Sequence, residues 1–182
     1  DGGAIAELGF GLTAILGVFE RPAPSFLIWG DSLGWGLGDG ADQNGNSGLY
    51  ERGLWRVYPD GSPAPYVNMS RSGDQLASNV PMLAPLKRGL ISYVSHVIVA
   101  LGTNDISVGR DLDAIKEDAR AIWRSVRRHG AKVVAVKILP KTRTGANSEI
   151  FSDAYRPGGV RDLYNAWLDT RVGIDVDHVL DP

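Results

Sequence analysis

The chain has 182 residues, of which 43% are hydrophobic and 22% are charged, a composition typical of a globular domain with one well-buried core. Its 19 Lys and Arg against 21 Asp and Glu give a formal net charge of -2, so no overall field favours nucleic acid or an anionic membrane as a partner. The absence of cysteine excludes disulfides, thiolate metal sites and cysteine nucleophiles, which leaves serine as the candidate covalent catalyst and leaves the compartment open.

The first apolar stretch, residues 4–19, is shorter than the ~20 apolar residues that a membrane span needs, and it contains Glu7. It also lacks the basic start and small-residue cleavage site of a signal peptide. We therefore expect a surface or docking helix within an N-terminal segment, residues 1–24, of a single domain that covers residues 1–182.

Five apolar runs have the β-branched and aromatic content of strands buried on both faces. These predicted strands are residues 26–29, 66–70, 96–101, 131–139 and 174–180. Amphipathic segments between them predict helices from Ser47 through Tyr58, at residues 81–90, from Leu112 to His129, and at residues 160–170. Strands that alternate with helices imply right-handed crossovers, so we predict an α/β fold in three layers, with helices on both faces of a mainly parallel five-stranded sheet.

Polar clusters follow three of the predicted strands, at residues 30–33 (GDSL), 72–74 (SGD) and 102–105 (GTND). Each cluster alone is weak evidence, because Gly-Asp-Ser is usually a turn and Asn-Asp after a strand is usually a helix cap. In a parallel sheet, however, the carboxyl ends of the strands lie at one edge, where open α/β sheets bind ligands. The sequence therefore predicts one site at that edge, with Ser32 as the candidate nucleophile.

The segments FLIWGDSLGWG, MSRSGDQ and VIVALGTND resemble, in this order, the first three sequence blocks of the GDSL esterases and lipases, also called SGNH hydrolases. The resemblance implies a flavodoxin-like fold and hydrolysis of a small acyl ester without metal or cofactor. An acetylated sugar is one candidate substrate. The resemblance also implies an oxyanion hole made by the backbone N–H groups of Ser32 and Gly73 and the side-chain amide of Asn104. Asp31, Thr103 and Asp105 would support these groups.

The acid and base that Ser32 needs are predicted from the histidines. His96 opens a buried strand and His129 closes a helix, which leaves His178 as the base and Asp175 as its carboxylate partner. Their spacing, Asp-x-x-His, matches the last motif of the family.

A second arrangement stays open, because residues 1–19 resemble the family's final loop and helix with Ala4 in place of the histidine. The domain would then be circularly permuted, with Asp1 in the catalytic loop, and the alternative function would be an ester- or carbohydrate-binding domain that lacks its base. A phosphate-binding domain is a weaker alternative, because the glycines of GWGLG are not followed by the Lys-Ser/Thr of a P-loop.

Two groups of side chains bear on the substrate. The aromatic residues Trp35, Tyr50, Trp55 and Tyr66 suit a carbohydrate if they surround the loop after Ser32, but Trp55 can equally pack a helix face. Arg71 and residues 141–143 (KTR) could attract an anionic substrate, although such charges are usually solvated loop residues. We expect a small-molecule or carbohydrate ester as the partner.

Overall fold

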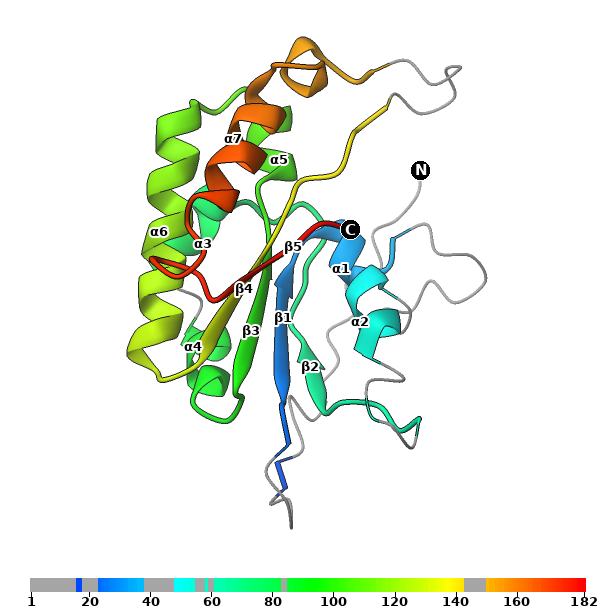
Figure 1. Ribbon diagram of the computed structural model, residues 1–182, viewed down its shortest axis with the longest axis vertical. Helices are drawn as coiled ribbons and strands as arrows, with labels where there is room; N and C mark the ends of the chain where they lie inside the picture. Colours follow the sequence, from blue (N-terminus) through cyan, green and yellow to red (C-terminus); the bar gives the residue numbers. More distant parts are fainter. Residues whose placement is uncertain are drawn as a thin grey trace, which may run out of the picture.

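The computed structural model describes residues 16–17, 23–37, 48–54, 58, 61–82, 85–142 and 150–182. Its centre is a five-stranded sheet in which every pairing is parallel and the strand order is β2-β1-β3-β4-β5 (Figure 1). The strands are β1 (Phe26–Gly30), β2 (Tyr66–Asn68), β3 (His96–Ala100), β4 (Lys132–Val136) and β5 (His178–Leu180). The prediction of an α/β fold with a parallel five-stranded sheet is therefore confirmed.

Helices cover both faces of this sheet, as Figure 1 shows. One layer holds α3 (Leu76–Met82), α4 (Pro85–Ile91), α6 (Leu112–Arg128) and α7 (Val160–Asp169). The opposite face carries α2 (Leu49–Leu54), next to the short α1 (Ser32–Trp35). Two further short elements, α5 (Thr103–Ser107) and the 3-10 turn η1 (Asp153–Tyr155), lie in connections. None of the helices in the described ranges is long and apolar enough to cross a membrane.

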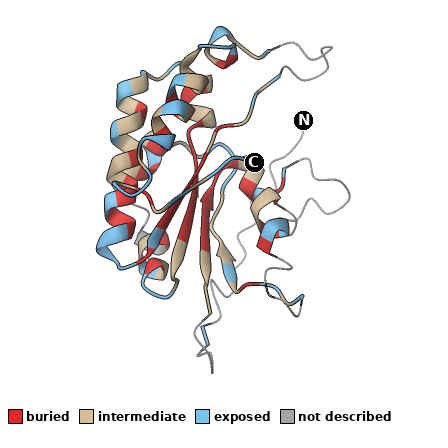
Figure 2. Cartoon of the chain, viewed as in Figure 1, coloured by how far each residue is buried: buried red, intermediate tan, exposed pale blue. Residues whose placement is uncertain are grey.

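The core lies mainly between the sheet and the layer of α3, α6 and α7 (Figure 2). Successive strand residues face opposite sides, so Leu27 and Trp29 enter this larger core while Ile28 joins a smaller cluster that includes Leu54 of α2. Apolar residues on α6 recur at helical spacing, and Asp111 caps its start by accepting from the N–H groups of Asp113 and Ala114. Because both faces of the sheet are covered, residues that point to either side are apolar. This explains the continuous apolar runs in the sequences of the strands.

Several predicted boundaries are wrong, and each error has a local cause. The predicted helix over residues 81–90 is two helices, and the second begins at Pro85, where a missing backbone N–H costs no helical bond. The predicted strand over residues 174–180 is only β5, because Gly173 adopts a left-handed φ of 77° and the N–H groups of Asp175 and Val176 turn back to Arg171 O. The N-terminal segment that we predicted to be helical lies largely outside the described residues.

Candidate active site

Ser32 lies at the carboxyl end of β1, at the first position of α1. Asp31 caps this helix, since its Oδ1 accepts a hydrogen bond of 3.0 Å from the N–H of Leu33. Gly36 ends the helix in the left-handed conformation (φ 88°), where a side chain would be strained, and it donates its N–H to the carbonyl of Ser32. The backbone on both sides of the half-buried Ser32 is therefore held in one conformation.

The close packing behind Ser32 depends on two glycines. A side chain at Gly30 would place its Cβ 2.8 Å from the hydroxyl of Ser70, and one at Gly34 would collide with the same hydroxyl. Ser70 itself is held by Asn68, whose Oδ1 accepts from the Ser70 N–H at 2.9 Å. The segment after β2 therefore lies directly against the start of α1.

A second loop reaches the same edge through backbone bonds. The N–H of Arg71 donates to the carbonyl of Gly30 at 3.1 Å, and the N–H of Asp74 closes a turn on Arg71 O at 3.1 Å. Gly73 lies inside this turn with φ of 81°, a conformation that favours glycine, and it is exposed. The backbone of Gly73 is therefore accessible, two residues after Arg71, which is bonded to the end of β1.

The third loop is joined to the second by the side chain of Asn104. Its Nδ2 donates a hydrogen bond of 2.9 Å to the carbonyl of Asp74. An asparagine amide has two N–H groups, so this bond orients the amide and leaves a second donor. Asp105 lies beneath, fully buried, and its carboxylate accepts from the N–H groups of Leu76 at 2.8 Å and Ala77 at 3.1 Å. Burial raises the pKa of the Asp105 carboxyl, and these two hydrogen bonds oppose that effect.

These contacts bring Ser32, Gly73 and Asn104 to one edge of the sheet. Gly30 and Ala100 are register partners in β1 and β3, and the loops that follow them carry Ser32 and Asn104 respectively. The loop that bears Gly73 is bonded to both, through Gly30 and through Asn104. The three loops therefore bring a hydroxyl, the exposed backbone of Gly73 and an asparagine amide to the same edge.

Asp31, the residue directly before Ser32, is only 3% exposed. Burial raises its pKa to about 6, against the opposing effects of the Leu33 N–H and the positive charge of Lys141. A carboxyl with that pKa changes charge close to neutral pH. Its neighbours at this edge include Tyr50 and Thr103, which line the same small pocket.

Replacement of this carboxyl should therefore change how stability depends on pH. Because the pKa is raised on folding, the folded state binds more protons than the unfolded state between pH 4 and 6, and stability falls as pH rises through that window. We expect Asp31→Asn, which keeps the Oδ1 acceptor for Leu33, to gain about 2 to 3 kcal/mol relative to the wild type between pH 4 and pH 7. Urea unfolding at both pH values measures this, and parallel pH profiles would contradict it.

The structure does not assemble the predicted triad of Ser32, Asp175 and His178. His178 is the register partner of Val134 in β4, and through Ile98 in β3 this row of residues leads to Ile28 in β1. β5 therefore lies three strands away from β1. At a spacing of about 4.8 Å per strand, His178 is about 14 Å across the sheet from β1, whereas a general base must be about 3 Å from the hydroxyl. Asp175 pairs instead with Arg171 at 3.4 Å.

The other histidines lie elsewhere too. His96 opens β3 at the amino edge, where its ring stacks on Phe26 and its Nδ1 lies 2.7 Å from Ser95 Oγ. His129 ends α6 with its Nδ1 2.8 Å from the carbonyl of Ser125. All three histidines of the sequence are among the described residues, and none lies at the Ser32 edge. The alternative position, Ala4, lies outside the described residues.

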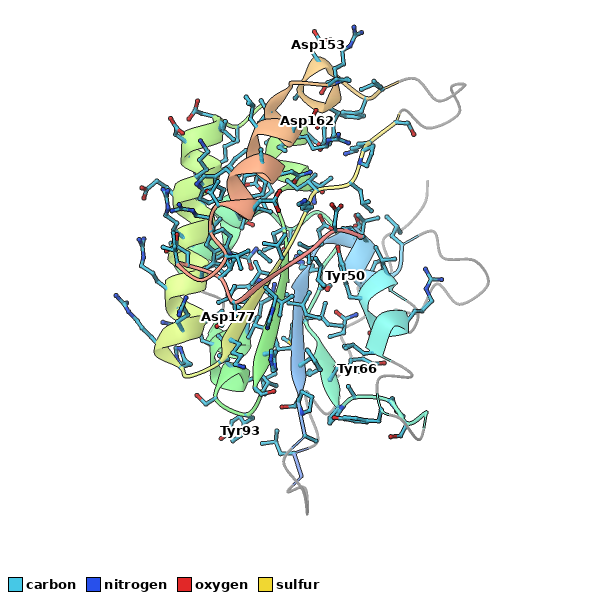
Figure 3. All side chains as sticks on the ribbon, in the orientation of Figure 1. Tyr50, Tyr66, Tyr93, Asp153, Asp162 and Asp177 are labelled. Carbon is cyan, nitrogen blue, oxygen red and sulfur yellow. The ribbon has the colours of Figure 1, made fainter. Side chains whose placement is uncertain are left out.

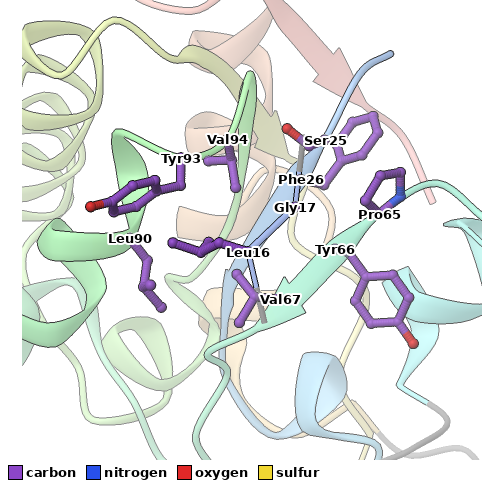
Figure 4. A pocket seen from close by; sticks show the side chains of 10 residues that line it. All are labelled: Leu16, Gly17, Ser25, Phe26, Pro65, Tyr66, Val67, Leu90, Tyr93 and Val94. Carbon is purple, nitrogen blue, oxygen red and sulfur yellow. The ribbon is translucent and has the colours of Figure 1, made fainter. Parts of the chain in front are cut away.

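The aromatic prediction holds for only part of its set. Tyr50 lines a pocket with Asp31 and Leu33 at the carboxyl edge, and Trp35 is 37% exposed on α1. Tyr66 instead begins β2 and lines a pocket at the amino edge with Phe26 and Tyr93 (Figures 3 and 4). The expectation that Tyr66 surrounds the loop after Ser32 is therefore wrong, because the first residue of a parallel strand lies at the opposite edge. Trp55 lies outside the described residues.

The predicted cations also differ in their surroundings. Arg71 is exposed beside the Gly73 turn. Lys141 donates to Ser107 Oγ at 2.8 Å and lies 4.3 Å from the ring centroid of Phe151, while Arg143 is outside the described residues. Lys141 is thus a partnered side chain at the carboxyl edge.

A buried polar cluster that is not predicted above lies behind the Gly73 turn. Lys87, 7% exposed, forms an ion pair of 2.7 Å with Asp74, and it also donates to Asn79 Oδ1 at 3.1 Å. The available signal was the spacing of Lys87 with Leu90 and Ile91, which places a lysine on the apolar stripe of its helix.

The parallel strand order β2-β1-β3-β4-β5, with helices on both faces, defines a doubly wound α/β protein. In open sheets of this class, ligands bind at the carboxyl edge, at the switch point that lies here between β1 and β3. Residues 28–182 match the GDSL-like lipase/acylhydrolase family, and the chain belongs to that family. This places the chain among the carboxylic ester hydrolases of the GDSL/SGNH type.

Solved structures are similar in fold. The esterase EstA from Pseudoalteromonas sp. has a TM-score of 0.64 at 18% identity, with 87% of this chain and 76% of EstA covered. A protein of the G-D-S-L family from Desulfitobacterium hafniense has a TM-score of 0.61 at 15% identity, with 86% and 76% covered. TesA has a TM-score of 0.54 at 28% identity, and the match covers 64% of this chain and 62% of TesA. No curated protein matches the chain in sequence.

Proposed function

We propose that the chain is a serine esterase in which Ser32 is the nucleophile and the N–H groups of Ser32, Gly73 and Asn104 form the oxyanion hole. The observation that carries this proposal is the pair of hydrogen bonds that ties the three loops together, from Arg71 N to Gly30 O and from Asn104 Nδ2 to Asp74 O. Rigid placement of donors around a developing oxyanion is usually the largest single contribution to acyl transfer.

The chemistry follows from these groups. Ser32 Oγ attacks the ester carbonyl as its proton passes to a base, and the carbonyl oxygen becomes an oxyanion that accepts hydrogen bonds from the three donors. Collapse of this intermediate breaks the bond to the alcohol oxygen, which takes up the proton. Water then attacks the acyl-serine, and the carboxylic acid leaves with Ser32 restored.

The substrate class that we propose is a small acyl ester, with an acetylated carbohydrate as one member. Tyr50 beside Asp31 and the partly exposed Trp35 support this choice, because aromatic faces next to polar groups suit sugar rings. EstA, which shares the fold, is an esterase inhibited by monoethylphosphonate in its structure.

A second candidate is an ester-binding domain with little turnover. The specific observation in its favour is that none of the three histidines lies at the edge that carries Ser32. In that case the oxyanion donors would still hold an ester carbonyl, but Ser32 would stay protonated.

Turnover of p-nitrophenyl acetate separates the two candidates. An esterase should release p-nitrophenol in repeated turnovers and be labelled on Ser32 by an organophosphonate, as seen by mass spectrometry. Retention of an ester ligand without turnover or labelling would favour the binding domain. Labelling of a different serine would contradict the assignment of Ser32.

The role of His178 can be tested separately. Since β5 places this side chain about 14 Å across the sheet from β1, we expect His178→Ala to change kcat for p-nitrophenyl acetate less than twofold. His129→Ala is the matched control, because that imidazole is also partly exposed and away from Ser32. A loss of two or more orders of magnitude in the His178 variant alone would restore it as the base.

A further inference from the structure

We infer that the buried ion pair between Lys87 and Asp74 is a positioning device that holds the oxyanion donors Gly73 and Asn104 in place. This inference rests on the proposed function, since it assigns a role relative to that oxyanion hole. Lys87 touches no reacting atom; it acts through the loop that ends in Asp74.

Asp74 is held both by its side chain and by its backbone carbonyl. Its carboxylate oxygen Oδ2 is 2.7 Å from Lys87 Nζ, while its backbone carbonyl accepts from Asn104 Nδ2 at 2.9 Å. Asp74 also directly follows Gly73 in the chain. A shift of Asp74 would therefore move both the Gly73 backbone and the partner that orients the Asn104 amide.

Lys87 is itself fixed by residues on other elements. Its Nζ donates to Asn79 Oδ1 at 3.1 Å and lies 5.3 Å from the ring centroid of Trp29. Asn79 Oδ1 accepts in addition from Trp29 Nε1 at 2.9 Å, and Asn79 Nδ2 donates to the carbonyl of Gln75 at 2.7 Å. The ammonium therefore connects the loop to α3, to α4 and to β1, the strand that leads to Ser32.

Both members of the Lys87–Asp74 ion pair are largely buried, which favours a single geometry of the pair. The side chains of Lys87 and Asp74 are only 9% and 15% exposed. Desolvation lowers the pKa of Lys87, and the ion pair with Asp74 opposes this effect. A buried ammonium that lost its carboxylate would be left uncompensated, so the pair has a strong preference for one geometry.

The test removes both charges together, because Lys87→Met alone would strand the Asp74 carboxylate and could unfold the protein. In Lys87→Met with Asp74→Asn, we expect kcat for p-nitrophenyl acetate to fall about tenfold with KM changed less than twofold, since the donors act mainly in the transition state. The control is Arg110→Met with Asp118→Asn, which removes an ion pair of 2.6 Å whose carboxylate is also 15% exposed. It should leave kcat within twofold.

A coupling measurement distinguishes positioning from general weakening of the fold. If the ion pair acts through the oxyanion donors, its removal should cost less than threefold in kcat once Asn104→Ala is present. An undiminished tenfold loss in that background would overturn the inference. If Ser32→Ala keeps full activity, the proposed function fails, whatever the ion pair does.

Hydrogen exchange provides a readout that needs no turnover. The N–H groups of Asp74 and Leu76 are bonded to Arg71 O and Asp105 Oδ2. We expect their exchange to be at least tenfold faster in the Lys87 and Asp74 double variant and unchanged in the control pair. Unchanged exchange at both amides would overturn the inference even for a protein with no esterase activity.

Discussion

Ser32→Ala should lower kcat/KM for p-nitrophenyl acetate by at least about four orders of magnitude, the scale seen when a serine nucleophile is removed. The reason is that no covalent acyl intermediate can form without the hydroxyl. Steady-state release of p-nitrophenol measures the effect. The fold should be retained, because Ser32 is half-buried and its helix is capped by Asp31 rather than by its own side chain.

Ser70→Ala is the matched control for this variant. Ser70 also lies beside the start of α1, with its hydroxyl buried against Gly30 and Gly34, but the proposed mechanism gives it no chemical role. We expect its kcat/KM to stay within about tenfold of the wild type. Full activity of Ser32→Ala, with unchanged thermal unfolding of both variants, would rule out Ser32 as the nucleophile.

Asn104→Ala should lower kcat by about two to three orders of magnitude, the usual effect of losing one oxyanion donor. Asp74 already orients the amide, so in the proposed oxyanion hole the second N–H would meet the transition state without reorganisation. KM should change little, because the oxyanion forms only after the attack. The kinetics of p-nitrophenyl acetate hydrolysis report both constants.

Asn104→Asp sharpens that experiment, since it keeps the size of the side chain and removes its N–H donors. We expect a loss at least as large as that of the alanine variant, because a carboxylate would repel the oxyanion. A rate close to the wild type in either variant would mean that the donor is a different group. The rest of the proposed oxyanion hole, at Gly73 and Ser32, would then need a new partner.

Two aspartates, Asp74 and Asp31, join the loops of the candidate site to the elements behind them. Asp74 lies between Asn104 and Lys87, and Asp31 lies between β1 and the helix that begins with Ser32. Both carboxylates are largely buried, so a substitution that removes either charge acts on the loop that the carboxylate holds. If these loops carry the proposed oxyanion donors, such substitutions should lower kcat more than they change KM.

The parallel α/β fold and the position of Ser32, Gly73 and Asn104 at its carboxyl edge can be predicted from the amino-acid sequence alone. Runs such as residues 97–100 are buried on both faces, so their apolar character is visible without any knowledge of their neighbours. Ser32, Gly73 and Asn104 each lie in the loop or short helix that follows one of the strands. Parallel topology then brings them to one edge without further information.

The positions of His178 and Lys87 depend on how separate elements pack, and local sequence patterns do not show them. The position of a three-residue strand such as β5 along the sheet is set by its pairing with β4. A register shift of one residue would move each side chain along the strand and turn it to the other face of the sheet. Lys87 finds its partner 13 residues away in a loop, and local spacing shows only that a lysine faces the apolar side. Pairings of this kind depend on the packing of separate elements, because a buried charge is stable only where a partner has been placed beside it.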